Sequence, residues 1–277
     1  MFGFFKRRPL LDPAASQWIF ATYEWALRNF GSDIFYEDTV LVQPTNERFS
    51  DLRAAPEKLV ENIFDRVRTF AAMQDWPCEL QAQEPDAITH VAPFVHMEGA
   101  PRGPAGTFRI TAADGQAQPR ALITYNPDQV RDPGALVATF AHELAHYLAH
   151  SCEDDPPGGE DLHEHATDLL AVFQGFGIFL ANSAFSFQQF QGAGSQGWSS
   201  RRQGYLSQYE LVYALALFCQ LKGLTRREAE PFLKSSLVPF FRKSWKEIEV
   251  DPGLAHLKTI DVRKKSSVAN SSSEARA

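Results

Sequence analysis

The chain contains little cysteine and no concentration of basic residues. Only three of its 277 residues are cysteines, and they are widely spaced, which is typical of reduced thiols in a cytosolic protein rather than of a disulfide framework. The net charge is −7 and the lysines and arginines are scattered, so the sequence indicates no nucleic-acid-binding surface. Because 44% of its residues are hydrophobic, the chain can bury a large core, and this excludes disorder for most of its length.

The sequence also lacks a convincing membrane segment. Residues 169–185 are the most apolar stretch, but Gln174 and Asn182 interrupt it, and it is shorter than the roughly 20 residues that a bilayer requires. We therefore predict a buried core helix there and no membrane span. Near the N-terminus, no apolar core of signal-peptide length precedes Asp12, so we expect no export by that route and a cytoplasmic location.

The segment TFAHELAHYLAH, residues 139–150, has the clearest chemical pattern in the chain. On a helix, His142 and His146 lie on one side, one turn apart, and can direct their imidazoles at one metal ion. Glu143 lies beside them, where its carboxylate can hold and deprotonate a metal-bound water. Zinc lowers the pKa of that water, so a carboxylate is a sufficient base. The pattern makes zinc-dependent hydrolysis the leading hypothesis.

The surroundings of the motif support this interpretation over a chance match, which short patterns of this kind produce often. Asp132 and Pro133 are a good N-cap and first-turn pair. A helix this apolar is expected to be buried, and its two histidines and glutamate then need partners that a metal can supply. The apolar face consists of Leu136, Val137, Phe140, Leu144 and Leu148.

A third ligand is expected on a second helix, which we predict over residues 161–180. Glu164 and Asp168 are four positions apart and share a face, so one could bind the metal while the other accepts the free N–H of a ligating histidine. An alternative is that Glu164 only caps this helix, in a D-x-x-E arrangement with Asp161. His163 and His165 are further ligand candidates, although we expect them to be exposed, and His150 is expected to be a surface or supporting histidine.

With these residues, the chain resembles the gluzincin metallopeptidases, in which an HExxH helix is followed by a second helix with ExxxD. Glu164-His165-Ala166-Thr167-Asp168 matches that second motif, and the likeness covers only about forty residues. The resemblance implies one Zn²⁺ per chain, bound by His142, His146 and Glu164, with Glu143 as the base and Asp168 as the residue that orients a ligand. Asp168 as a direct ligand, as in aspzincins, stays an alternative. The metzincin pattern does not fit, because Ala149 and Cys152 replace its glycine and third histidine.

Hydrophobic periodicity predicts an α+β fold, mainly helical, with a small, mostly antiparallel sheet preceding the HExxH helix. Helices are expected over residues 13–30 and 56–73, and strands between 89 and 125. The resemblance implies a zincin-like core in which strand 121–126 borders the cleft and pairs with extended substrate. We expect one zincin-like metallopeptidase domain, residues 1–261, made of an N-terminal helical part (1–85), a sheet with the metal-binding helices (86–182) and a C-terminal helical part (183–261), followed by a disordered tail, 262–277.

The residue that stabilises the negative charge of the transition state is less clearly marked. A glycine- and serine-rich loop after the second helix leads to Tyr205, the first candidate, and the other candidates are Tyr209, Arg201, Arg202 and His256. No motif singles out one of them. The sequence thus predicts a zinc metallopeptidase acting on a peptide or protein substrate, and it sets no oligomeric state. The alternatives are a non-catalytic or regulatory zinc-binding module and a zinc hydrolase with a different substrate.

Overall fold

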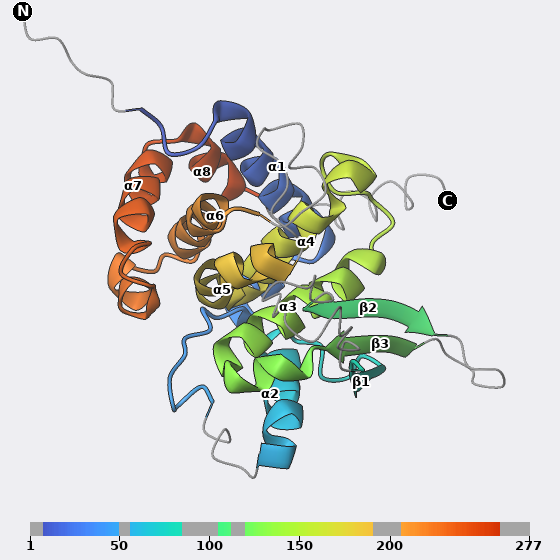
Figure 1. Ribbon diagram of the computed structural model, residues 1–277. Coiled ribbons are helices and arrows are strands. Elements are labelled where there is room, and N and C mark those ends of the chain that lie inside the picture. The colour runs from blue at the N-terminus through green and yellow to red at the C-terminus, as the bar shows by residue number, and fades with distance from the viewer. Residues whose placement is uncertain (1–7, 50–55, 85–104, 112–119, 191–205, 261–277) are drawn as a thin grey trace, which may run out of the picture.

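The computed structural model describes residues 8–49, 56–84, 105–111, 120–190 and 206–260. Within these ranges the chain is mainly helical, with one three-stranded sheet placed to one side of the helices (Figure 1). Part of the region 89–125 in which strands are expected, Tyr205 and the tail 262–277 lie outside the described residues. In the part of the chain that is described, no helix combines the length and apolarity needed to cross a bilayer.

The first two helices form close to where the sequence predicts them. Helix α1 (Pro13–Asn29) begins with the side chain of Asp12 accepting a hydrogen bond from the backbone N–H of Ala14, at 2.8 Å. It ends before Gly31, which has a φ of +91°. Helix α2 (Pro56–Phe70) follows the short π-helix Ile34–Asp38. The buried face of α2 contains Val60, Ile63, Phe64 and Val67.

The sheet is mixed rather than mostly antiparallel. Strand β3 (Arg120–Tyr125) lies in the centre, parallel to β1 (Cys78–Ala82) and antiparallel to β2 (Gly106–Thr111). Strand β1 lies in the part of the chain that the sequence predicts to be helical; it is largely exposed and shows little apolar alternation, so its pattern does not indicate a strand. The expectation that residues 121–126 pair with substrate is also wrong, since β3 has both edges paired within the sheet. Strands β1 and β2 are the two edge strands of the described sheet.

Helix α3 (Pro133–His150) is the central element of the fold. The short 3-10 helix Pro127–Arg131 leads into it, and the side chain of Asp132 accepts the N–H of Ala135 at 3.1 Å, as the sequence predicts. Helix α3 packs against α2, β2 and β3 and also against α4 (His163–Ala171) and α5 (Gly177–Phe190), so it lies between the sheet and the other helices (Figure 1). Residues 135–145 are all buried. Its side chains are therefore held from several sides.

The helix predicted over residues 161–180 is broken into two. A 3-10 turn (Gly159–Leu162) precedes α4, and a π-helical turn (Val172–Phe176) separates α4 from α5. The break occurs at Gly175, which has a φ of +99° and whose carbonyl accepts the N–H of Val42 at 3.0 Å. A Cβ at Gly175 would collide with the carbonyl oxygen of Val40, so this crossing requires glycine. The apolar stretch is buried as predicted, although it is not one continuous helix.

The remaining helices pack on the side of α5 away from the sheet (Figure 1). Helix α6 (Gln208–Leu221) begins with a capping box formed by Ser207 and Glu210 and is buried along almost its whole length. Two 3-10 turns (Arg226–Glu228 and Glu230–Phe232) lead to α7 (Val238–Glu249) and α8 (Pro252–Leu257). One apolar cluster contains side chains from α1, α2, α3, α5, α6 and α7.

Candidate metal centre

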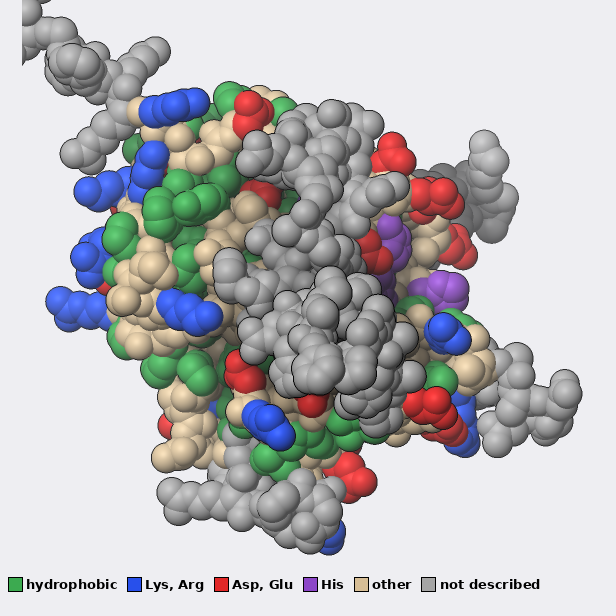
Figure 2. All heavy atoms as spheres, viewed as in Figure 1, with side chains coloured by type: hydrophobic (Ala, Val, Ile, Leu, Met, Phe, Trp, Pro, Cys, Tyr) green, Lys and Arg blue, Asp and Glu red, His purple; other side chains and the backbone are tan. Residues whose placement is uncertain are grey.

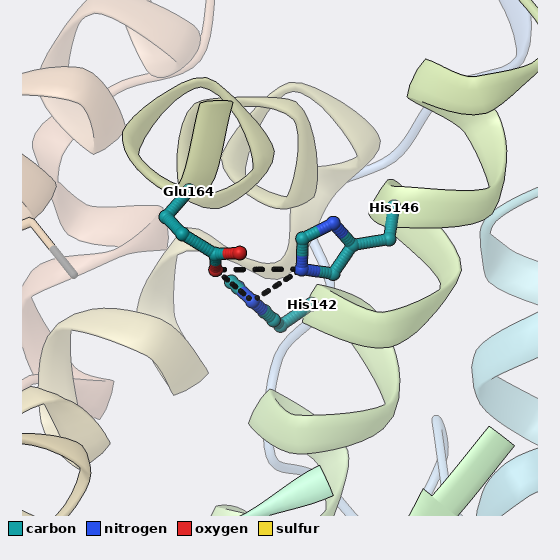
Figure 3. Close-up of side chains that lie close together, drawn as sticks. All are labelled: His142, His146 and Glu164. Carbon is teal, nitrogen blue, oxygen red and sulfur yellow. Dashed lines mark hydrogen bonds and ion pairs between the residues drawn. The ribbon is translucent and has the colours of Figure 1, made fainter. Parts of the chain in front are cut away.

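The structure brings together the three side chains that the sequence predicts as metal ligands (Figure 3). His142 Nε2 and His146 Nε2 are 3.1 Å apart, and Oε2 of Glu164 lies 3.3 Å from the first and 3.4 Å from the second. Two of the donors come from consecutive turns of α3 and the third from the first turn of α4. In the described part of the chain, this is the group of His, Cys, Asp or Glu side chains whose ligand atoms converge closely enough for one metal ion.

The spacing of these donor atoms suits a tetrahedral metal ion. Zinc bonds to imidazole nitrogen and carboxylate oxygen are about 2.0–2.2 Å long, so neighbouring ligands of a tetrahedral ion lie about 3.3–3.5 Å apart. The three separations, 3.1–3.4 Å, are close to this value. Two imidazoles and a carboxylate also leave a fourth position, which a catalytic zinc site uses for water or substrate. The residues present therefore fit a zinc ion.

Glu164 does not cap its helix. Helix α4 begins at His163, its N-cap is Leu162, and no side chain caps it. The carboxylate of Glu164 instead contacts both imidazoles and remains 46% exposed. Burial raises its pKa, but hydrogen bonds to His142 and His146 outweigh this effect, and the net pKa is lowered. The capping alternative is wrong, and Glu164 has an ionised carboxylate that faces the two histidines.

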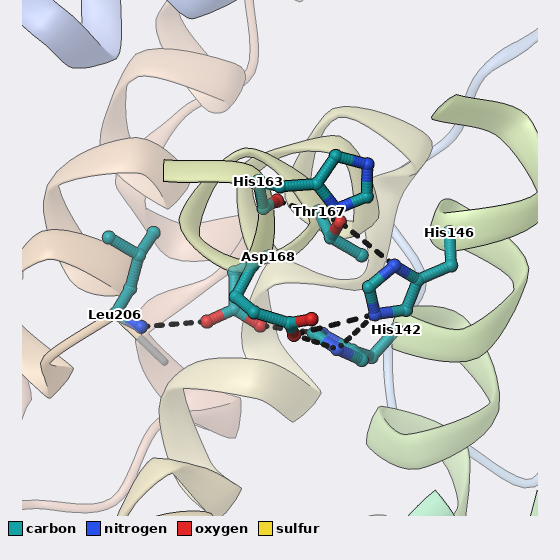
Figure 4. Close-up of polar contacts among 7 residues, drawn as sticks. His142, His146, His163, Thr167, Asp168 and Leu206 are labelled. Carbon is teal, nitrogen blue, oxygen red and sulfur yellow. Dashed lines mark hydrogen bonds and ion pairs between the residues drawn. The ribbon is translucent and has the colours of Figure 1, made fainter. Parts of the chain in front are cut away.

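Asp168 holds the opposite side of the His142 ring. Its Oδ1 lies 2.9 Å from His142 Nδ1, and its Oδ2 accepts the backbone N–H of Leu206 at 2.8 Å (Figure 4). Both carboxylate oxygens are thereby used, and the side chain is 6% exposed. Asp168 is not among the three converging side chains, and it contacts the opposite ring nitrogen of His142.

Negative charge gathers around His142. Burial lowers the pKa of this imidazole, but hydrogen bonds to Asp168 and Glu164, together with the charges of Asp168 and Glu143, outweigh this effect and raise the pKa to about 10. Without a metal ion, a proton on His142 therefore partly neutralises the negative charge of the surrounding carboxylates. On the face drawn in Figure 2, histidine side chains reach the surface near aspartate and glutamate side chains. Such surroundings favour a cation.

Glu143, the predicted base, is buried directly beside the ligands. Its residue is 3% exposed, and burial together with the nearby charge of Glu164 raises its pKa to about 7, against the opposing effect of His142. The backbone of β2 lies against it, because a Cβ added at Gly106 would be 2.7 Å from Glu143 Oε1 and 2.7 Å from the methyl carbon of Thr139. A carboxyl group with a pKa near neutrality can take up and release a proton at physiological pH.

The other histidines near the motif take separate positions. His163 is half-buried and stacks on His146, with ring centroids 5.5 Å apart and an interplanar angle of 16°. His165 is buried and packs edge-on against Trp18, so its predicted exposure is wrong. His150 is exposed as expected. Phe108 of β2 stacks in parallel on His146 at 6.2 Å. No pattern in the sequence predicts the contact between Phe108 and His146, because it depends on how β2 packs along α3.

Of the residues predicted to stabilise the transition state, the structure describes Tyr209 and His256, and both contact residues outside the candidate metal centre. Tyr209 packs on Phe240 with ring centroids 4.6 Å apart, and His256 lies 3.1 Å from Glu24 of α1. Tyr205, Arg201 and Arg202 lie outside the described residues.

Comparisons of the chain with models of known protein families, with curated proteins and with solved structures found no match. The candidate site therefore has to be judged by its own geometry.

Proposed function

We propose that the chain is a zinc-dependent hydrolase that cleaves peptide bonds. The observation that carries this proposal is the convergence of two Nε2 atoms and a carboxylate oxygen within 3.1–3.4 Å, with the buried carboxylate of Glu143 directly beside them on the same helix. A structural zinc site is normally closed by four protein ligands, whereas three ligands and an adjacent carboxylate match the arrangement of hydrolytic sites.

The protein groups divide the chemistry between them. When bound, zinc would lower the pKa of a water molecule and polarise the carbonyl group of the substrate. Glu143 accepts the proton of that water and then donates it to the leaving amine. In the metal-free protein, burial raises the pKa of this carboxyl group to about 7. Asp168 keeps the Nε2 of His142 directed toward the other two donors.

The order of the elements supports a zincin-like core of the gluzincin type. A strand precedes the HExxH helix, and the ExxxD residues follow on the next helix, where Glu164 faces the histidines and Asp168 holds one of them. We place the protein in the cytoplasm, because all three cysteines are free thiols.

An extended peptide is the substrate that suits the edge of the sheet. Strands β1 and β2 are both edge strands of the described sheet, and β2 is the one that runs along α3, from Gly106 beside Glu143 to Phe108 beside His146. A peptide added to this edge would exchange backbone hydrogen bonds with β2 and pass close to Glu143 and the three donor atoms. This assignment moves the substrate-binding role from β3 to β2.

Substitution of Glu143 by glutamine tests the proposal. We expect the variant to bind as much zinc as the wild type and to lose peptidase activity by at least about 100-fold, because the base is removed while the ligands remain. Zinc would be measured by mass spectrometry of the metal, and activity with a peptide library read out by product masses. Glu249→Gln, at the exposed end of α7, is the charge-matched control. A Glu143→Gln variant with unchanged activity would contradict the proposal. Zinc binding without activity in the wild type would favour a non-catalytic zinc-binding module.

A further inference from the structure

Helix α4 contacts both histidines of α3 through two consecutive residues. Asp168 meets Nδ1 of His142, and the hydroxyl of Thr167 lies 3.3 Å from Nδ1 of His146 (Figure 4). In both cases the nitrogen on the far side of the ring, Nε2, is the atom that points toward Glu164. The role of Asp168 follows from the ExxxD motif, whereas no motif assigned a role to Thr167.

The single hydroxyl proton of Thr167 already has an acceptor. Thr167 Oγ1 lies 2.9 Å from the carbonyl oxygen of His163, one turn earlier in α4, and a carbonyl oxygen can only accept. The lone pairs of Oγ1 remain available to accept a hydrogen bond from His146. A hydrogen bond between Thr167 Oγ1 and His146 Nδ1 therefore requires that Nδ1 carry the ring proton. Thr167 is completely buried, and its hydroxyl therefore makes this contact away from bulk solvent.

We propose that Thr167 is a positioning residue that fixes His146 in the Nδ1–H tautomer and so leaves the lone pair of Nε2 directed at the metal position. A chain of hydrogen bonds runs from His146 Nδ1 to Thr167 Oγ1 and on to the carbonyl oxygen of His163. Thr167 thus does for His146, with a neutral acceptor, what Asp168 does for His142 with a charged one. That this lone pair binds zinc rests on the proposed function, whereas the assignment of the tautomer does not.

The competing explanation is that Thr167 only stabilises its own helix. The chain offers a matched control for this, because Thr22 in α1 is 1% exposed and its hydroxyl donates to the carbonyl of Trp18, four residues earlier, at 2.9 Å. A purely helical role predicts the same consequences for Thr22→Val and Thr167→Val. A positioning role predicts that only the second variant changes the behaviour of the site.

Zinc affinity, measured by competition with a chelating dye, is the first test. Loss of a group that orients a metal ligand typically weakens metal binding by about 10- to 100-fold, and we expect this for Thr167→Val. Thr167→Ser keeps the hydroxyl and should bind within about threefold of the wild type, and Thr22→Val should bind like the wild type. Equal affinity of Thr167→Val and wild type would overturn the inference, as would an equal loss in Thr22→Val.

The second test compares the wild type with Thr167→Val and needs no metal. In zinc-free protein labelled with ¹⁵N at histidine, long-range proton–nitrogen spectra at pH 8 distinguish the two neutral tautomers, and the signal of His146 is identified by its absence from the spectrum of His146→Gln. Because the carboxylate of Glu164 can accept an Nε2–H of His146 when no metal is present, the inference requires a larger Nδ1–H population in the wild type than in Thr167→Val, and equal populations in the two proteins would overturn it. Because this result does not depend on zinc uptake, a chain that binds no zinc would refute the proposed function while this test still decides the role of Thr167.

Discussion

The two helices that form the site differ in how they are built. Helix α3 has 18 residues, a side-chain N-cap and no interruption, and its own four-residue spacing places His142 and His146 side by side. Helix α4 has nine residues and no side-chain cap, and it runs into a π-helical turn. The donor pair of α3 is therefore fixed by local helix geometry, whereas the contribution of α4 depends on how it packs against α3.

Removing His142 should have the largest effect, because this residue joins the two helices. We expect His142→Ala to lower zinc affinity by more than about 100-fold. It also leaves the buried carboxylate of Asp168 without its charged partner, which should lower the free energy of unfolding of the metal-free protein by about 3–5 kcal/mol. Metal titration and urea unfolding measure the two effects. His150→Ala, on the exposed end of the same helix, is the control. Unchanged stability of the metal-free variant would show that the contact between Asp168 and His142 contributes little.

Removing the carboxylate of α4 should affect the metal and spare the fold. We expect Glu164→Ala to weaken zinc binding by about 100-fold. Its effect on the unfolding of the metal-free protein should be small, since this side chain is 46% exposed. The neighbouring His163→Ala should change zinc affinity by less than about threefold, because His163 stacks on His146 without joining the three donors. A larger loss for His163→Ala than for Glu164→Ala would transfer the ligand role to His163.

A third substitution examines α3 from the side of the sheet. A Cβ at Gly106 would lie 2.7 Å from Glu143 Oε1 and 2.9 Å from the carbonyl oxygen of Thr124, so β2 or the carboxylate must shift. We expect Gly106→Ala to lower peptidase activity by about 10- to 100-fold while zinc binding is retained, because the base is displaced and the ligands are not. Gly134→Ala is the control, since its Cβ would meet the tip of the Asp132 side chain at 3.3 Å. Full activity of Gly106→Ala would mean that the position of Glu143 is not set by β2.

The same contrast explains what the sequence could predict. The positions of His142 and His146 follow from helix periodicity, and Glu164 and Asp168 follow from a motif with fixed spacing. The role of Thr167 depends on the approach of α4 to α3, and a threonine within a helix carries no signal of that approach. The break at Gly175 depends on the chain crossing at Val40, more than 130 residues earlier. The features that the sequence leaves undetermined are those created by tertiary packing.

Zinc binding should also depend on pH, because carboxylates of α4 hold a proton on an imidazole of α3. The pKa of His142 is raised from 6.5 to about 10 in the metal-free protein, against the effect of burial, and zinc requires the neutral ring. Zinc uptake then releases this proton, so apparent affinity should rise about tenfold per pH unit between 6.5 and 9. The folded metal-free state binds this proton more tightly than the unfolded chain does, so its stability should fall as pH rises from 6.5 toward 10.

Chelator competition and urea unfolding across this pH range measure both trends, and affinity that does not change with pH would contradict them. Asp168→Asn separates the contributions of the two helices, because it keeps the shape of the side chain and removes one of the charges that hold the proton on His142. The variant should bind zinc with a flatter pH dependence. Its affinity at high pH should be lower than that of the wild type, because the orienting carboxylate is lost and few protons compete with zinc for His142 at that pH. An unaltered pH dependence in Asp168→Asn would assign the proton on His142 to Glu164 and Glu143 instead.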